Sequence, residues 1–336
     1  MKKIKKVGGT MKSFTLYLIP LLILFSCSKK YSTNWQKIKL SYITEVKKLT
    51  PDSKELKLWI PIPKSNRHQE VSDIRIKSPY EYVIKTDNKY KNRYIYIHTK
   101  DQQKDFSVAV NFTVKRLENK NNNTYDSGKG PMKWALKPNK LIPVSEVVKK
   151  RANDVLKNEK TKTQKARTIY MHTLEHMEYN KKGKGWGRGD FNYACLVKKG
   201  NCTDFHSYYI ALMRSLSIPS YFEIGLSVPK NKREGEIKGY HCWAYYWDGS
   251  FWVPVDISEA DKNQKMTKYY FGSIDEHRIA FTIGRDILLN PKQNLVPLNF
   301  FIYPYAEVDG LVHRHVTRKI SFKKVSGTRG MKKKYY

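Results

Sequence analysis

Acidic residues are scarce in this sequence. Only 30 aspartates and glutamates oppose 64 lysines and arginines, which gives a formal net charge of +34 over 336 residues. A chain this basic attracts anionic partners, such as nucleic acid, anionic lipid or an acidic polymer. The lysines are dispersed along the whole chain, and hydrophobic residues still make up 40% of it. These features indicate a folded protein with a solvated basic surface, and they exclude a disordered chain.

The sequence also lacks an N-terminal apolar run long enough for a confident membrane span. The run from Phe14 to Ser26 is short and contains Pro20, whereas a spanning helix needs about 20 apolar residues. Lysines precede this run, which is the pattern of a secretory signal. Its end, "LLILFSC", resembles a bacterial lipobox, in which the cysteine is lipidated and becomes the mature N-terminus. We therefore expect residues 1–26 to be a lipoprotein-type signal peptide and Cys27 to carry lipid.

This interpretation places the protein outside the cytoplasm, lipid-anchored to the bacterial cell envelope. An uncleaved N-terminal anchor is the alternative. An exported protein does not meet the chromosome, so we expect no nucleic-acid partner. The expected partners are the membrane, through lipidated Cys27, and an anionic lipid or cell-wall polymer that the basic surface attracts.

Cysteine is the next scarce residue, with four in the chain. If Cys27 carries lipid, three remain: Cys195, Cys202 and Cys242. An odd number in an oxidising compartment leaves at least one free thiol and excludes a fully disulfide-stapled scaffold. Cys202 can therefore be a nucleophile, a half-cystine paired with Cys195, or a small core residue.

Hydrophobic periodicity divides the chain into two domains. Alternating apolar and polar residues, separated by turn residues, predict an antiparallel β-sandwich at residues 37–118. Residues 119–140 are polar and rich in glycine and asparagine, so we expect a linker. A second domain is expected at residues 141–317, with the segments 268–291 and 298–310 as strands that finish its sheet. The basic tail, residues 318–336, either extends the sheet or stays loose against an anionic surface, and we expect that it can be removed without loss of the fold.

A helical stripe follows Cys202. The apolar residues of this stripe recur at the spacing of one buried helix face: Phe205, Tyr208, Tyr209, Leu212, Met213 and Leu216. Cys202 lies three residues before Phe205, which places it on the core-facing side of the first turn. The exposed N–H groups at a helix start stabilise a thiolate and can bind an oxyanion.

A predicted hairpin brings a histidine and an aspartate together. The dipeptide Asp248-Gly249 separates two aromatic-rich runs, which is a strong signal for a two-residue turn. In that register Trp247 pairs with Ser250, and His241 lies directly opposite Asp256 with Cβ atoms about 5 Å apart. The carboxylate can then hold the imidazole in one tautomer while the imidazole deprotonates a thiol.

Two other interpretations of these residues are open. His241 and Asp256 can form a structural pair without catalysis. Cys202, His241 and Cys242 can also be considered as zinc ligands, but neighbouring strand residues point to opposite faces and no two-cysteine spacing supports a tetrahedral site. We expect no metal.

The motifs, taken together, resemble the transglutaminase-like superfamily, whose members are relatives of papain. The matching stretches are "KKGNCTDFHSYYIALMRSLSIPSYFEIG", "GYHCWAYYWDG" and "FWVPVDISEA", in the order Cys…His…Asp, and the likeness extends from about Val144 to Val308. The resemblance implies an α+β protein: the β-sandwich precedes a catalytic domain whose nucleophile helix packs on an antiparallel sheet. It implies Cys202 as the nucleophile, His241 as the base and acid and Asp256 as the orienting carboxylate, with no cofactor.

The resemblance also implies an oxyanion hole made from the N–H of the cysteine and a donor upstream of it. Trp186, Asn192 and Tyr193 are candidates for that donor; Tyr193 is preferred, although packing or loop roles fit them equally well. The expected function is thiol-dependent acyl chemistry on amide bonds of protein or peptide substrates. Either hydrolysis (a peptidase or amidase) or acyl transfer to an amine (a transglutaminase) fits the motifs. The alternative is a non-catalytic envelope binding or assembly module that keeps the fold.

Overall fold

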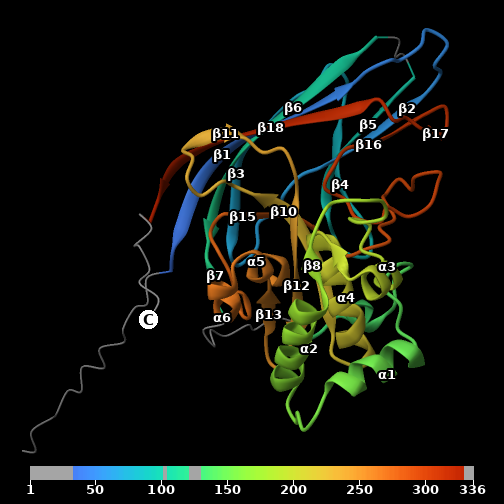
Figure 1. The fold of residues 1–336 in the computed structure, drawn as a ribbon. Helices are drawn as coiled ribbons and strands as arrows, with labels where there is room; N and C mark the ends of the chain where they lie inside the picture. The colour runs from blue at the N-terminus through green and yellow to red at the C-terminus, as the bar shows by residue number, and fades with distance from the viewer. Residues whose placement is uncertain (1–32, 101–103, 121–129, 329–336) are drawn as a thin grey trace, which may run out of the picture. The chain divides into compact units, whose positions relative to one another are not determined.

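Two five-stranded antiparallel sheets form a β-sandwich (Figure 1). The computed structural model describes residues 33–100, 104–120 and 130–328. One sheet has the order β11-β18-β1-β6-β3, with β1 (Trp35–Val46), β3 (Gln69–Lys77), β6 (Phe106–Leu117), β11 (Glu234–Glu236) and β18 (Val316–Gly327). The other has the order β17-β16-β2-β5-β4, with β2 (Leu56–Pro61), β4 (Val83–Thr86), β5 (Arg93–Thr99), β16 (Tyr305–Val308) and β17 (Leu311–Val312).

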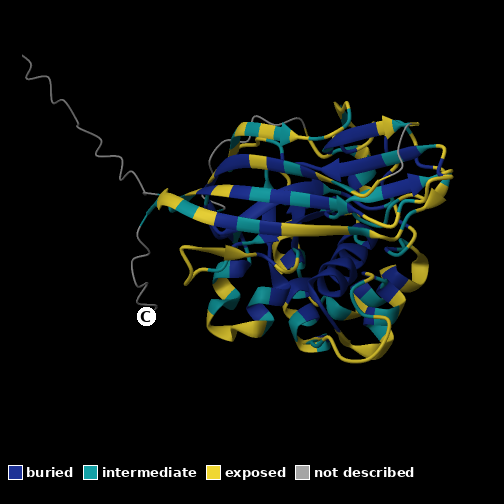
Figure 2. Ribbon diagram, turned by 90° about the horizontal axis from the view of Figure 1, so that it is seen from above, coloured by how far each residue is buried: buried dark blue, intermediate teal, exposed yellow. Residues whose placement is uncertain are grey.

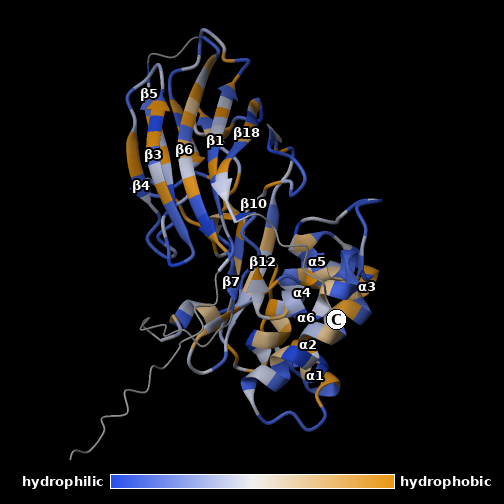
Figure 3. Ribbon diagram, turned by 90° about the vertical axis from the view of Figure 1, so that its left-hand side faces the viewer, coloured by the Kyte–Doolittle hydropathy of each residue, from blue (hydrophilic) through white to orange (hydrophobic). Residues whose placement is uncertain are grey.

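Alternation of side chains explains why these strands pack as a sandwich. Along β1 every second residue from Ile38 to Val46 is buried, and β6 shows a similar alternation. Figure 3 shows hydrophobic and hydrophilic bands along these strands. Apolar side chains from both sheets, such as Leu40 and Leu58, belong to one core cluster. The antiparallel sandwich expected from the period-two pattern is therefore confirmed.

A third antiparallel sheet packs against helix α4 (Cys202–Ser215). Its order is β13-β12-β10-β15, with β10 (Ser220–Ser227), β12 (His241–Trp247), β13 (Trp252–Val255) and β15 (Arg278–Ile283). Helix α4 is buried along its whole length and contacts β12 and β10. In Figure 2 this helix is dark blue, while exposed residues gather on the outer helices. The predicted helix after Cys202 and its packing on an antiparallel sheet are therefore confirmed.

Shorter elements surround this core. The other helices are α1 (Glu146–Val155), α2 (Lys162–His176), α3 (Phe191–Val197), α5 (Ile257–Lys262) and α6 (Thr267–Tyr270), with 3₁₀ turns η1 (Lys133–Leu136) and η2 (Gln264–Met266). Two-stranded pairs join β7 (Asn119–Lys120) to β14 (Ser273–Ile274) and β8 (Glu178–Tyr179) to β9 (Lys199–Gly200). Within the described ranges, no helix is long and apolar enough to cross a membrane. The expected signal peptide and Cys27 lie outside those ranges.

The C-terminal part of the chain returns to the sandwich, which corrects one expectation and decides another. Segment 298–310 does not finish the sheet β13-β12-β10-β15, because its strand β16 pairs with β2 of the sandwich. Residues 318–327 extend a sandwich sheet rather than remain loose, because β18 pairs with β1 from Gln36 to Val46 and buries Ile320 and Phe322. Polar residues on the outer face of this strand hid the alternation that marks its inner face.

The expected linker at residues 119–140 is also partly built into the fold. Asn119 and Lys120 form β7, which pairs with β14. Trp134 in η1 packs edge-on against Tyr90 of the sandwich region and against Tyr221 of β10. The chain from Thr33 onward is consequently one unit rather than two domains joined by a free segment.

Candidate active site

A capping box fixes Cys202 at the start of α4. The Asn201 side chain accepts a hydrogen bond from the Thr203 N–H (2.8 Å), and the Asp204 carboxylate accepts one from the Asn201 N–H (2.9 Å). This reciprocal arrangement defines the first turn of a helix. Cys202 is the first helical residue, and only 2% of it is exposed. Its own N–H belongs to the first turn, where N–H groups have no partner within the helix.

The same carboxylate holds the glycine-rich loop against α4. Asp204 accepts hydrogen bonds from the Gly187 N–H (2.6 Å) and the Gly189 N–H (2.9 Å). Gly189 has φ +64° and packs so closely that a Cβ would lie 2.5 Å from Ser207 Oγ. This loop, residues 183–189, therefore approaches the first turns of α4 closely, which the lack of a side chain at Gly189 allows.

His241 and Asp256 meet as predicted, but in a different register. Their side chains are joined by a 2.7 Å hydrogen bond between His241 Nε2 and Asp256 Oδ2. The expected two-residue turn is wrong, because Trp247 pairs with Trp252 rather than Ser250. The longer loop shifts β13 by two residues, which keeps every side chain on its face. Asp256 lies just beyond the ladder and caps α5, so it reaches His241 diagonally.

Cys202 interacts with this histidine at the helix start. The ionisation of each side chain affects that of the other. Burial alone would raise the pKa of the Cys202 thiol, but its interactions with Cys242 and then His241 hold that pKa well below the ordinary value. Burial would likewise lower the pKa of His241, but the Asp256 carboxylate raises it to about 9. The favoured state is a thiolate beside an imidazolium.

Asp256 stays ionised despite being fully buried. Burial opposes its charge, but His241 and then Arg278 hold the pKa of this carboxyl below its usual range. Its second oxygen, Oδ1, accepts hydrogen bonds from Ser258 Oγ (3.3 Å) and the Glu259 N–H (3.2 Å). The Arg278 guanidinium lies 3.6 Å from Oδ2. These partners fix the carboxylate that orients His241.

A second buried histidine, His206, was missed by the sequence analysis. Its Nδ1 lies 2.7 Å from the Cys202 carbonyl oxygen, and its Nε2 accepts a hydrogen bond from the Ile257 N–H at 3.0 Å. It lies one turn after Cys202 on α4, a spacing that could have drawn attention to it, but its contact with α5 depends on the tertiary fold. His206 therefore connects Cys202, at the start of α4, with Ile257, the residue after Asp256.

Cys242, the residue after His241, is buried against α4. Its sulfur lies 3.8 Å from Thr203 Oγ1 and 3.7 Å from His206 Nδ1. Cys195, Cys202 and Cys242 are free thiols in this structure, so the pairing of Cys202 with Cys195 is not formed. Among the described residues, no group of three or more His, Cys, Asp or Glu side chains is arranged to hold a metal ion.

Tyrosines interact electrostatically with the buried Cys202 thiol. The side chains whose ionisation is coupled electrostatically to that of Cys202 include Tyr179, Tyr240 and Tyr303. Tyr240 bonds through its hydroxyl to Asn201 Nδ2 at 3.0 Å. Tyr193, the preferred oxyanion donor, lies in α3 with its ring against Gly185, which leaves no room for a Cβ there. The structure gives Tyr193 a packing contact, and its role as a donor stays a prediction.

The other two oxyanion candidates lie nearby in the chain. Trp186 is half-buried in the glycine-rich loop and Asn192 is exposed in α3. The Cys202 N–H, at the start of α4, is the remaining part of the expected oxyanion hole.

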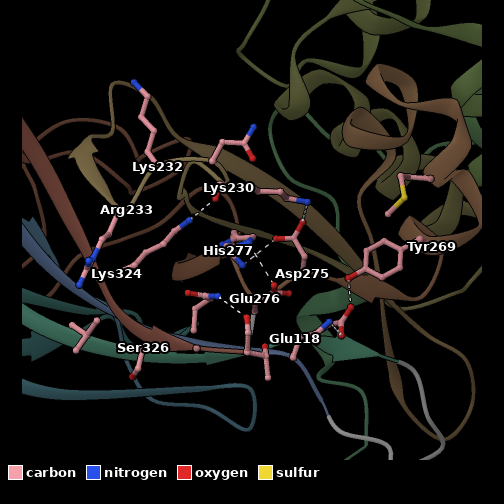
Figure 4. A pocket seen from close by; sticks show the side chains of 17 residues that line it. Glu118, Lys230, Lys232, Arg233, Tyr269, Asp275, Glu276, His277, Lys324 and Ser326 are labelled. Carbon is pink, nitrogen blue, oxygen red and sulfur yellow. Dashed lines mark hydrogen bonds and ion pairs between the residues drawn. The ribbon is translucent and has the colours of Figure 1, made fainter. Parts of the chain in front are cut away.

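A cavity of about 860 Å³ lies to one side of the site (Figure 4). Lys230 points across it towards Asp275, with 2.9 Å between Nζ and Oδ2. Asp275 Oδ1 lies 3.5 Å from Arg278 Nη1, and Arg278 contacts Asp256 in turn. None of the three side chains Cys202, His241 and Asp256 lines this cavity. Asp275, which lines the cavity, is nevertheless linked through Arg278 to the Asp256 carboxylate.

Comparison with known proteins identifies the domain that carries these residues. Residues 149–257 match the family model described as "Transglutaminase-like superfamily", a range that contains Cys202, His241 and Asp256. An uncharacterized protein from Haemophilus influenzae is 28% identical over 297 residues, covering 75% of this chain and 80% of its own.

Two solved structures add to this comparison. The "Putative Cysteine Protease" from Cytophaga hutchinsonii has a TM-score of 0.59 at 15% identity and covers 91% of this chain and 94% of its own, so it shares the fold. The periplasmic domain of TgpA from Pseudomonas aeruginosa aligns at a TM-score of 0.34 and 11% identity over 70% of this chain and 94% of its own. The family match and the shared fold agree with the architecture described above: the chain contains a transglutaminase-like domain, with a papain-like core that presents Cys202 at the start of its buried helix.

Proposed function

We propose that this protein is a cysteine-nucleophile enzyme that breaks amide bonds in protein or peptide substrates. The observation that carries the proposal is the 2.7 Å hydrogen bond between His241 and buried Asp256, together with a Cys202 thiol whose pKa His241 helps to lower. A thiol, a base and an orienting carboxylate that interact in this order are the components of nucleophilic acyl chemistry. The match of residues 149–257 to the transglutaminase-like model supports a cysteine-based reaction.

The mechanism follows from the charges of the site. The Cys202 thiolate attacks the amide carbonyl carbon, and the carbonyl oxygen becomes an oxyanion beside the Cys202 N–H at the positive end of α4. The C–N bond breaks as the amine leaves with the proton of the His241 imidazolium, which yields a thioester on Cys202. Neutral His241 then deprotonates the incoming acceptor, and the thiolate leaves.

The acceptor decides the net reaction. Water gives a peptidase or amidase, and an amine gives a transglutaminase. We propose hydrolysis as the main reaction, because amine transfer requires a site that admits an amine and keeps water out. We also propose that the enzyme acts at the cell envelope, anchored through lipid on Cys27, because the first 27 residues have the pattern of a lipoprotein signal.

Trapping the thioester tests this proposal with any peptide that the site accepts. The protein is incubated with a mixture of glutamine-containing peptides and hydroxylamine, and the products are read by mass spectrometry. Hydroxamates are expected from the wild type, because hydroxylamine intercepts a thioester whichever acceptor is natural. Parallel reactions in isotopically labelled water and with a biotinylated primary amine separate hydrolysis from transfer.

Two variants control this experiment. Cys202→Ala is expected to lower product formation by on the order of 10³-fold or more, whereas Cys195→Ala, which changes another free cysteine, is expected to retain it. Turnover that survives in Cys202→Ala would refute the assignment of the nucleophile. A wild-type protein that forms no covalent product but captures peptides would instead favour the non-catalytic binding module.

A further inference from the structure

A small pocket lies where β18 meets the segment that leads into the active site. The Ile237 N–H donates a hydrogen bond to the Ile320 carbonyl of β18 (2.8 Å), and the chain then runs through Gly239 to His241, the first residue of β12. The cavity between this segment and β18 has a volume of about 180 Å³. Pockets for drug-sized ligands have about 300–1,000 Å³, so this one suits a single side chain or the end of a chain.

Two aromatic rings connect the pocket with the nucleophile. Tyr303 lines the pocket, and its ring centre lies 5.9 Å from that of Tyr240. The Tyr240 hydroxyl lies 3.0 Å from Asn201 Nδ2 and 2.9 Å from Thr203 Oγ1, which belong to the residues on either side of Cys202. An extended peptide covers about 3.3–3.6 Å per residue. A substrate bound at Cys202 therefore reaches the pocket with a few of its residues.

Arg318 offers this pocket an unused set of hydrogen-bond donors. Its guanidinium carbon lies 3.4 Å from the centre of the Tyr303 ring, over the face of that ring. The N–H groups of arginine lie in the guanidinium plane, so stacking on an aromatic face leaves them available to a carboxylate. Arg318 lies two residues before buried Ile320 on β18, which directs both side chains to the inner face. It forms no ion pair with any residue that the structure describes.

The charges around the pocket favour an anion. Lys238 is exposed, lines the pocket beside Arg318, and has no carboxylate partner in the described part of the chain either. The acidic residue of the lining, Glu236, is exposed on the edge strand β11 and pairs with neither cation. The pocket therefore presents two positive charges against one negative charge. In a peptide substrate, the group that satisfies them is a carboxylate.

We propose that this pocket is a substrate subsite that binds a carboxylate of the peptide, held by the Arg318 guanidinium and the Lys238 ammonium, and that the enzyme prefers acidic peptides. This inference rests on the proposed function, in which Cys202 acts on peptide amides. The carboxylate belongs either to an acidic side chain or to the C-terminus of the peptide. Both sources have the same chemistry, and the experiment separates them.

Pairs of peptides built around one glutamine test the subsite. In one arm the members of a pair differ by a C-terminal carboxylate or carboxamide, and in the other by glutamate or methionine at a position within three residues of the glutamine. The two members compete in the hydroxylamine reaction, and mass spectrometry gives the ratio of their kcat/KM values. The proteins are the wild type, Arg318→Gln, Lys238→Gln and the control Lys319→Gln, which removes the same charge from a residue outside the pocket.

We expect the wild type to prefer the carboxylate member of at least one pair by roughly three- to tenfold. Arg318→Gln and Lys238→Gln are expected to bring that ratio close to one, while Lys319→Gln keeps it. Thermal unfolding checks each variant, and Lys238→Gln decides the matter if Arg318→Gln does not fold. A wild-type ratio near one in every pair, a ratio that both pocket variants leave unchanged, or an equal loss in Lys319→Gln would overturn the subsite.

Binding to Cys202→Ala separates this inference from the proposed function. Calorimetry with the same peptide pairs measures affinity without turnover. If the wild type forms no product but Cys202→Ala prefers carboxylate peptides, and adding Arg318→Gln removes that preference, the subsite stands and the enzyme assignment falls. If products form without any carboxylate preference, the enzyme assignment stands and the subsite falls.

Discussion

Gly189 is a residue whose lack of a side chain supports the site. It has φ +64°, and a Cβ there would lie 2.5 Å from Ser207 Oγ and 2.6 Å from Arg285 Nη1. Gly183 has a similar φ of +83° but has nothing within 4 Å of the same position. Replacing either glycine would place a side chain on a left-handed backbone, at a cost of about 1 kcal/mol. The two positions differ only in the space available for a Cβ.

We therefore predict that Gly189→Ala lowers the free energy of unfolding by about 2–4 kcal/mol, whereas Gly183→Ala lowers it by about 1 kcal/mol. Denaturant titration of the two variants measures the difference. Equal losses would show that the loop moves away from α4 without cost.

Prediction from sequence was best for residues that belong to motifs. Sequence patterns could single out three residues by their positions. Cys202 lies at a predicted helix start, and His241 and Asp256 lie on the two sides of the hairpin predicted around Asp248-Gly249. Asp204 was also within reach, since "NCTD" is a capping-box spacing. His206 could not be assigned, because its contact with the Ile257 N–H depends on the tertiary fold.

At the scale of elements, the site depends on the junction of α4 with α5. His206 joins the Cys202 carbonyl at the start of α4 to the Ile257 N–H at the start of α5. Both groups are buried, and each would cost about 1–3 kcal/mol if left without a partner. This junction sets the distance between the nucleophile and Asp256.

We predict that His206→Ala lowers the free energy of unfolding by about 2–5 kcal/mol. His98→Ala is the control, because His98 is exposed and its pair with Glu55 is a surface interaction worth at most about 1 kcal/mol. Chemical denaturation of both variants tests this. A loss from His206→Ala no larger than the control would mean that the two helix starts hold their places without it.

The hairpin shows what element-level reasoning can and cannot predict. Aromatic runs around Asp248-Gly249 predicted two antiparallel strands, and β12 and β13 are those strands. The turn is longer because the Asp248 side chain accepts hydrogen bonds from the N–H groups of Ser250 and Phe251. Such a local side-chain turn competes with the two-residue form and cannot be ranked against it from sequence.

At the scale of the whole molecule, the C-terminal strand joins the sandwich to the site. Arg318 on β18 lies with its guanidinium carbon 3.4 Å from the centre of the Tyr303 ring, and Tyr303 interacts electrostatically with Cys202. The boundary expected at residue 318 was wrong because long-range pairing between β18 and β1, which lie at opposite ends of the described chain, leaves no local signal.

We predict that a chain ending at His315 loses its cooperative fold or at least about 3–6 kcal/mol of stability, since it lacks the buried side chains of Ile320 and Phe322 and the partner of β1. A chain ending at Thr328 keeps all of β18 and serves as the control. Thermal unfolding compares the two. Equal melting temperatures would restore the view of residues 318–327 as a dispensable tail.

The pH dependence of the reaction follows from the coupled charges of Cys202 and His241. The pKa of Cys202 lies well below its ordinary value, so thiolate and reactivity are lost only as pH falls through that lowered pKa. The pKa of His241 is raised to about 9, so its proton for the leaving amine is present below that pH and lost above it. Amide cleavage should therefore be fastest between these limits and decline as pH rises through about 9.

The most direct measurement of the central claim is the pH profile of iodoacetamide labelling at Cys202 in the wild type and in His241→Ala, read by peptide mass spectrometry. We predict a wild-type midpoint well below the ordinary thiol pKa of about 8.5, and a shift to higher pH in the variant because the imidazolium is lost. An ordinary midpoint in both proteins would contradict the account, since it would mean that Cys202 and His241 do not form a thiolate–imidazolium pair.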